Sequence, residues 1–159
     1  GGCPLAVLPI EGGEVRSPDG TSKENPAEAA WVARLLEGLM DGGELEQRDI
    51  GIITPYAGQV RAIRDSVPGR YDSVEVRTVD GYQGREKEVI LFSCVRSNSD
   101  GNVGFLSDSR RLNVALTRSK RGLIVVGDPD TLRCDENWSA WLEYVRSRNL
   151  EAWHLLGMA

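Results

Sequence analysis

Short, almost continuous apolar runs alternate with amphipathic stretches along this chain, and the alternation limits the choice of fold more than any other feature. Residues 89–94 and 123–126 are the most apolar runs, which is typical of strands covered on both faces. Further strands are expected at 5–10, 50–54 and 74–78. The pattern predicts an α/β domain with a mostly parallel sheet, centred on the two most apolar runs.

Helices are predicted between these strands. Asn25 stands as an N-cap before Pro26, and Glu28 occupies the third helical position. The apolar residues expected to share one helix face are Trp31, Leu35 and Leu39; Tyr56, Val60, Ile63 and Val67; and Trp138, Trp141, Leu142 and Val145. Asp128 and Pro129 are interpreted as the cap and start of another helix. The polar segment 11–24 is expected to be a surface loop, and residues 150–153 a last short strand.

Charge is unevenly distributed. The chain has 159 residues, enough for one domain, and its formal net charge of -5 argues against binding nucleic acid through bulk positive charge. Residues 11–46 hold nine acids against three bases, whereas residues 107–122 hold five bases against one acid. A local cationic site therefore persists in an acidic protein.

Several classes of protein are disfavoured. The three cysteines lack metal-ligand spacing, His154 is the single histidine, and no GxxxxGK[ST] phosphate loop occurs. No pair of acids follows the central strands as a free-standing, toprim-like metal enzyme requires. Because no apolar run approaches ~20 residues, we expect no membrane association. The odd number of scattered cysteines does not support a disulfide framework, so we expect an intracellular location, in the cytoplasm or nucleus. The chain begins directly on an apolar run, so a fragment of a longer protein is expected.

The basic segment 107–122 has two interpretations. Leu112, Ala115 and Leu116 share an apolar helix side, Asp108 can cap the helix start, and Arg111 and Arg118 lie seven positions apart. One interpretation is a docked helix with solvated basic ends, stabilised by cations near its C-terminus. The other is an arginine held rigidly enough to offer two donors to a phosphate. Spacing alone does not decide between them.

Two polar segments follow predicted strands. In "TPYAGQ", residues 54–59, Thr54, Tyr56 and Gln59 lie at or just beyond a strand's carboxyl end, where α/β sheets bind ligands. A plain helix start is the alternative. The link "VDGYQGREK", residues 79–87, is shorter than the about 10 to 12 residues of a usual parallel crossover. It is either a solvated turn or a functional segment. Tyr56 and Tyr82 are candidates for stacking on bases, and the alternative for each is a core residue with a solvated hydroxyl.

These segments, in this order, resemble motifs of the second RecA-like lobe of superfamily 1 helicases, in the Upf1-like group. "IGIITPYAGQ" resembles motif IV, "VRTVDGYQGREKEVILFSCVRSN" motif V, and "GFLSDSRRLNVALTRSKRGLIVVGDP" motif VI. The resemblance runs from about residue 12 to 153. It implies a three-layer α/β sandwich of the RecA-like, P-loop NTPase type, with residues 1–159 as a single domain that has no phosphate loop of its own.

The resemblance also assigns roles. Arg118 matches the motif VI arginine finger, which reaches the γ-phosphate of ATP. Glu86, Gln83 and Gly84 match the corner that surrounds the nucleotide. The residues that match segments near single-stranded nucleic acid are Thr54, Pro55, Tyr56, Thr78, Val79 and Asp80.

The function implied is that of a second motor lobe in an ATP-dependent RNA or DNA helicase. ATP and Mg²⁺ would be held mainly by a first RecA-like lobe of the same protein, which this chain lacks, so the chain alone is expected not to hydrolyse ATP. Its expected partners are single-stranded RNA or DNA and that first lobe, in a monomeric protein. The alternative is a non-catalytic module, derived from a helicase, for protein contacts or weak nucleic-acid binding.

Overall fold

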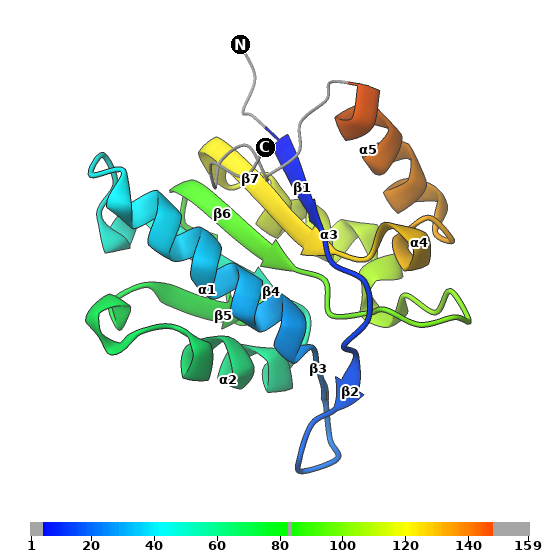
Figure 1. The fold of residues 1–159 in the computed structure, drawn as a ribbon. Helices are drawn as coiled ribbons and strands as arrows, with labels where there is room; N and C mark the ends of the chain where they lie inside the picture. Colours follow the sequence, from blue (N-terminus) through cyan, green and yellow to red (C-terminus); the bar gives the residue numbers. More distant parts are fainter. Residues whose placement is uncertain (1–4, 83, 148–159) are drawn as a thin grey trace.

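A five-stranded parallel sheet forms the centre of the computed structural model, which describes residues 5–82 and 84–147 (Figure 1). Its strands are β1 (Leu5–Pro9), β4 (Ile50–Thr54), β5 (Glu75–Thr78), β6 (Lys87–Ser93) and β7 (Ser119–Gly127). Their order across the sheet is β1, β7, β6, β4, β5, and all pairs are parallel. The two most apolar runs of the sequence, in β6 and β7, are neighbours in the interior, as predicted.

Helices cover both faces of this sheet and complete the predicted three-layer sandwich (Figure 1). One face carries α1 (Pro26–Asp41) and α2 (Ala57–Ser66). The other carries α3 (Ser109–Leu116), α4 (Pro129–Leu132) and α5 (Glu136–Ser147). Short 3₁₀ helices lie at Gln47–Asp49, Gly69–Tyr71 and Gly104–Ser107.

Successive side chains of the central strands enter two different cores. In β6, Val89 and Leu91 pack under α1 and α2, whereas Ile90 and Phe92 pack under α3 and α5. This follows from the two-residue period of a strand, and it explains why both faces of the strand must be apolar. The burial of apolar surface on both sides fixes the position of each strand. It therefore also fixes where the residues that follow each strand end are placed.

The segment 11–24 is not the plain surface loop that its composition predicted. Val15–Arg16 (β2) and Lys23–Glu24 (β3) pair as an antiparallel hairpin. Its turn is held by the Asp19 carboxylate, which accepts hydrogen bonds from the Ser17 hydroxyl at 2.6 Å and from Thr21 N at 3.0 Å. The hydrogen bonds of this polar turn stabilise the short β2–β3 strand pair. The alternation of apolar residues that would have predicted these strands is missing from the segment.

The short link between β5 and β6 is accommodated because these strands are not neighbours: each pairs with β4, from opposite sides. Residues 79–86 therefore lead back from the carboxyl edge of the sheet to its amino edge. The described part of the link contains a turn and no helix, and the Tyr82 ring is buried in the second core. Eight residues in extended form reach about 26 Å, which is enough to pass along a short strand.

Helix starts agree with the sequence, and one helix end does not. The side chains of Asn25, Asp108 and Asp128 accept from backbone N–H groups of α1, α3 and α4, as predicted. However, β7 begins at Ser119, so Lys120 and Arg121 lie in a strand rather than at the dipole of α3. The strand predicted at 150–153 and His154 lie outside the described residues.

Candidate functional site

The predicted site residues separate onto two opposite edges of the sheet. The carboxyl ends of β4 and β5 carry Thr54, Pro55, Tyr56, Thr78, Val79 and Asp80. The amino edge carries Gly84 and Glu86 just before β6, and Arg118 just before β7. Gln83 is outside the described residues. The described residues of the two predicted groups thus lie at opposite edges of the sheet, one group after β4 and β5 and the other before β6 and β7.

At the carboxyl edge, backbone contacts hold the ends of β4 and β5 side by side. The Val79 amide donates to the Thr54 carbonyl at 3.0 Å, and the Gly81 amide donates to the Thr78 hydroxyl at 2.9 Å. Thr54 is fully buried, and its Oγ1 is one of two buried side-chain atoms in the described residues without a hydrogen-bond partner. The other is Nε of Arg118, at the amino edge. Orphan atoms of this kind are rare in folded proteins and mark positions that need an explanation.

Tyr56, the residue before α2, is held by a buried cation. Nη1 of Arg96 donates to the Tyr56 hydroxyl at 3.1 Å, and Nε of Arg96 donates to the Glu14 carboxylate at 2.9 Å. Glu14 also accepts from the Ser97 amide at 2.9 Å and from Asn98 at 3.0 Å. Burial acts to raise the pKa of Glu14, but the hydrogen bonds from Asn98, Arg96 and Ser97 outweigh it, so the net pKa is lowered and the carboxylate stays ionised.

Gly104 fits closely over this arrangement. A Cβ at this position would collide with Nη1 of Arg96 and lie 2.6 Å from the Tyr56 hydroxyl oxygen, and the φ of Gly104 is +53°. Only glycine satisfies both conditions without displacing the guanidinium. The next residue, Phe105, has 57% of its surface exposed, and its ring centroid lies 5.2 Å from that of Tyr56.

A buried polar network lies beneath this edge and joins α1, α2 and β6. Glu28 has no exposed surface, and its Oε1 accepts from the Ser93 hydroxyl at 2.8 Å and from the Val95 amide at 2.9 Å. Gln59 donates to Ser93 Oγ at 3.0 Å and exchanges two hydrogen bonds with the backbone of Asn25. Burial raises the pKa of Glu28 to about 8, although hydrogen bonds from Val95 and Ser93 oppose the shift.

This network holds a strained turn in place. Val95 has a φ of +71°, a region that is costly for a β-branched residue. Its amide is bound by Glu28, and its carbonyl accepts from Asn25 Nδ2 at 2.9 Å. The turn at Val95 directly precedes Arg96, so the buried carboxyl group sets the direction of the guanidinium that reaches Tyr56.

Asp80 is not free at this edge. It forms a two-point ion pair with Arg111 in the first turn of α3, with Nε to Oδ1 at 2.9 Å. Both side chains are at least half exposed, so the pair contributes little stability. Its fixed geometry nevertheless joins the turn after β5 to α3, whose far end leads into Arg118.

At the amino edge, the contacts are fewer. The Lys87 amide donates to the Arg118 carbonyl at 2.9 Å, which places the ends of the two segments together. Glu86 is exposed, and the Tyr82 hydroxyl donates to the Arg85 carbonyl nearby. Within residues 5–82 and 84–147, no carboxylate forms an ion pair with Arg118. Its neighbour Arg121, by contrast, pairs with Glu88 at 3.0 Å.

Sequence reasoning missed four residues around the carboxyl edge: Glu28, Arg96, Phe105 and the hairpin residue Arg16. Spacing predicts Glu28 only as an N3 carboxylate, and its partners Ser93 and Val95, at and just after the end of β6, are more than 60 positions away. Phe105 lies in the segment that resembles motif VI, and the resemblance gives it no role. No local pattern distinguishes these residues, because their surroundings come from distant segments.

Metal ligation and membrane spanning are not supported by the described residues. Among them, no group of three or more His, Cys, Asp and Glu side chains is arranged to hold a metal ion. None of the helices in this part of the chain is both long and apolar enough to cross a membrane.

Comparison with known proteins defines the class. A family model described as an AAA domain matches residues 2–130, most of the chain, and the chain therefore belongs to this family. The five-stranded parallel sheet flanked by helices is consistent with the RecA-like fold predicted from the sequence. The similarity includes all three quoted motifs up to Asp130.

Individual relatives place the chain among Upf1-like superfamily 1 helicases. It is 41% identical to a regulator of nonsense transcripts 1 homolog of Drosophila melanogaster, over 92% of this chain and 13% of that protein. It is 46% identical to the DNA polymerase alpha-associated DNA helicase A of Schizosaccharomyces pombe, over 78% and 19%. The DNA-binding protein SMUBP-2 of Mus musculus is 43% identical, over 75% and 12%. The chain thus spans less than a fifth of the length of these relatives.

Proposed function

We propose that this chain is the second motor lobe of an ATP-dependent superfamily 1 helicase. In this proposal the amino edge of the sheet faces ATP bound on a first lobe of the same protein, and the carboxyl edge grips single-stranded RNA or DNA. The observation that supports the proposal is the separation of the two groups of motif residues onto opposite edges of one parallel sheet, one group after β4 and β5 and the other before β6 and β7. Two ligands can then be bound at once without competing for the same surface.

Arg118 is the proposed arginine finger. A guanidinium without an ion-pair partner among the described residues, next to an exposed edge, is suited to a γ-phosphate because no internal carboxylate competes for it. Its orphaned Nε is consistent with a partner supplied from outside this lobe. Glu86, Gly84 and Gln83 are proposed to surround the nucleotide at the same corner, while Mg²⁺ and most of the ATP contacts belong to the first lobe.

At the other edge, we assign direct strand contacts to Pro55, Thr78 and Val79, while Tyr56 and Asp80 contribute to the site indirectly. Tyr56 is only 6% exposed and its hydroxyl is bound to Arg96, so it supports the surface rather than stacking on a base. Thr54 supports this edge from its buried position through the backbone contact with Val79. Asp80 acts through Arg111, because a carboxylate does not itself attract a phosphate, whereas the guanidinium that it orients does. A few local cationic contacts of this kind are compatible with an acidic chain.

The test is Arg118→Ala in the intact helicase. An arginine finger contributes about 10³ to 10⁵ in turnover. We expect hydrolysis of ATP to fall by at least about 10³ while the affinity for a single-stranded oligonucleotide changes by less than about twofold. Arg121→Ala is the matched control, since it removes a nearby exposed arginine that already has a carboxylate partner.

Ordinary ATPase activity in the Arg118→Ala protein would contradict the finger assignment. The 159-residue chain alone is expected to show no ATPase activity and weak, salt-sensitive binding to single strands. Robust hydrolysis by this chain would contradict the proposed division between two lobes. Loss of nucleic-acid binding in the Arg118 variant would instead indicate that the two edges are not separate sites.

A further inference from the structure

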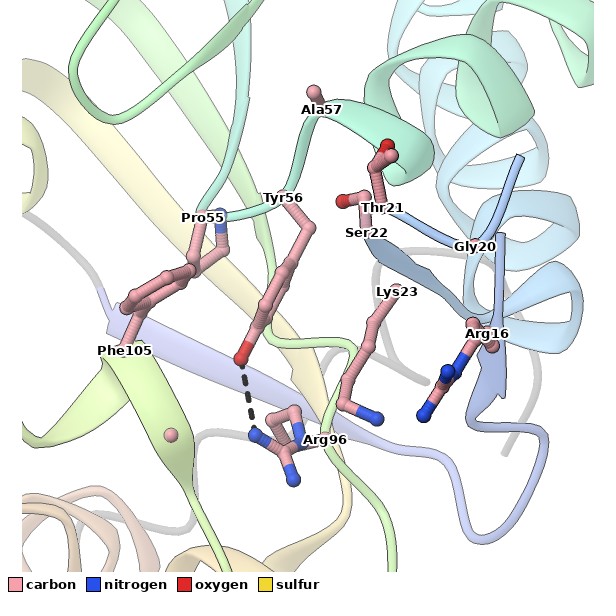
Figure 2. A pocket seen from close by; sticks show the side chains of 11 residues that line it. Arg16, Gly20, Thr21, Ser22, Lys23, Pro55, Tyr56, Ala57, Arg96 and Phe105 are labelled. Carbon is pink, nitrogen blue, oxygen red and sulfur yellow. Dashed lines mark hydrogen bonds between the residues drawn. The ribbon is translucent and has the colours of Figure 1, made fainter. Parts of the chain in front are cut away.

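A cavity of about 680 Å³ lies between the β2–β3 hairpin and the carboxyl edge of the sheet. The residues that matter most for its chemistry are Arg16, Lys23, Pro55, Tyr56, Arg96 and Phe105. Figure 2 shows the side chains of Arg16, Lys23 and Arg96 converging on one side of the cavity, with Phe105 beside Tyr56 on the other. None of the sequence motifs assigned a role to the hairpin.

The walls of this cavity are cationic. Three basic side chains face it, and Glu14 is the carboxylate that pairs with two of them, at 2.9 Å from Arg96 and at 3.7 Å from Lys23. Arg16 is exposed, and within the described residues no carboxylate pairs with it. Arg96 is only 6% exposed and is bound to Glu14 and Tyr56. Arg16 is therefore the cation most available to an anion. Lys23 is partly exposed and its ion pair with Glu14 is long, at 3.7 Å, so it can turn towards an anion, whereas Arg96 stabilises the wall.

The position of the hairpin is fixed rather than loose. Gly58 at the start of α2 donates to the Ser22 hydroxyl at 3.1 Å, and a Cβ on Gly58 would lie 2.8 Å from the Lys23 carbonyl oxygen. Arg61 of α2 pairs with Asp19 in the hairpin turn at 3.2 Å. These contacts fix the hairpin backbone that carries Arg16 and Lys23 relative to the sheet edge. An anion that binds these two side chains therefore needs to order little of the backbone.

The aromatic side of the cavity continues into a second one. Pro55 and Phe105 also line a cavity of about 150 Å³ together with Val79, Asp80 and Arg111. Phe105 thus stands between the two cavities, exposed over 57% of its surface. The exposed ring therefore has Arg16 and Lys23 on one side and the Arg111–Asp80 ion pair on the other. An aromatic stacking surface beside basic side chains is the combination that proteins use for single-stranded nucleic acid.

We propose that the hairpin cavity is a nucleotide subsite that extends the path of a single strand beyond the sheet edge. The strand passes Arg111, stacks a base on Phe105, and places the next phosphates on Arg16 and Lys23. This inference rests on the proposed function, because it assumes that a strand lies at this edge. It adds three contact residues from outside the assigned segments and gives the β2–β3 hairpin a purpose.

The experiment measures binding of a fluorescent single-stranded oligonucleotide to the intact helicase over a range of salt concentrations. For Arg16→Ala with Lys23→Ala, we expect weaker binding and a slope of log K against log salt that is shallower by about 1 to 2, because two phosphate contacts are lost. For Phe105→Ala, we expect binding weaker by about tenfold with an unchanged slope, since stacking releases no counterions. Phe105→Trp should retain the affinity.

The control removes two other exposed arginines, Arg70→Ala with Arg133→Ala, and so gives the same change in net charge at positions away from the cavity. If the hairpin variant matches this control in affinity and slope, the subsite is wrong. If the unmodified helicase itself fails to bind single strands, the proposed function fails instead. The substituted residues are exposed or partly exposed, and equal thermal unfolding temperatures of variant and control would establish that the fold is retained.

Discussion

The two edges of the sheet differ in how completely their polar side chains find hydrogen-bond partners within this domain. At the carboxyl edge, Tyr56, Arg96 and Glu14 are joined by hydrogen bonds over a buried network that centres on Glu28. At the amino edge, Glu86 is exposed and Arg118 has a buried Nε without a partner in the described part of the chain. The first edge is rigid within this domain, whereas the second lacks the groups that would satisfy it. Under the proposed function, the carboxyl edge would bind its ligand with residues of this domain, whereas the amino edge would need a second surface to complete its site.

The largest change in stability is expected from Glu28→Ala in the 159-residue chain. The substitution leaves the Ser93 hydroxyl and the Val95 amide buried without their acceptor, and it opens space under the strained turn. We expect the free energy of unfolding to fall by about 3 kcal/mol or more, measured by urea denaturation. A loss below about 1 kcal/mol would mean that the carboxyl edge is not held together by this network.

The pH dependence of stability sharpens the same point. The pKa of Glu28 is about 8 in the folded chain, compared with 4.5 for an ordinary glutamate, the value taken for the unfolded chain. Folding at a pH between 4.5 and 8 therefore takes up a proton. The stabilising contribution is complete below pH 4.5 and is lost as the pH rises towards 8, at up to about 1.4 kcal/mol per pH unit. Glu28→Gln keeps an acceptor for Ser93 and Val95 but does not titrate. Its unfolding free energy should therefore depend less steeply on pH between 5 and 8, and equal slopes in both proteins would exclude a buried protonated Glu28.

The smallest effect is expected at the amino edge. Arg118→Ala removes a buried donor that has no partner in the described structure, so the 159-residue chain should lose no stability and can gain up to about 1 kcal/mol. Thermal unfolding of the chain measures this. A marked destabilisation would show that Arg118 supports its own domain, and the contrast between the two edges would disappear.

Local sequence patterns predicted most of the fold because its elements depend on nearby residues. The capping side chains of Asn25 and Asp128 follow from spacing, and so does the burial of residues 89–92 on both faces of the sheet. The resemblance to helicase motifs grouped the site residues, and the topology then separated them by edge. The hairpin and the cation at Arg96 escaped prediction because each depends on contacts across long stretches of chain, such as Arg96 with Glu14, 82 positions away.

The short link between β5 and β6, whose described residues form no helix, connects these two edges through the backbone. Val79 and Asp80 begin it beside the proposed strand, Glu86 ends it beside the proposed nucleotide, and Tyr82 anchors its middle in the core. A segment this short has little slack over such a path. A shift of Val79 and Asp80 would therefore be transmitted along the backbone to Glu86 over only a few peptide units. The link is the shortest covalent connection between the proposed strand site and the proposed nucleotide site.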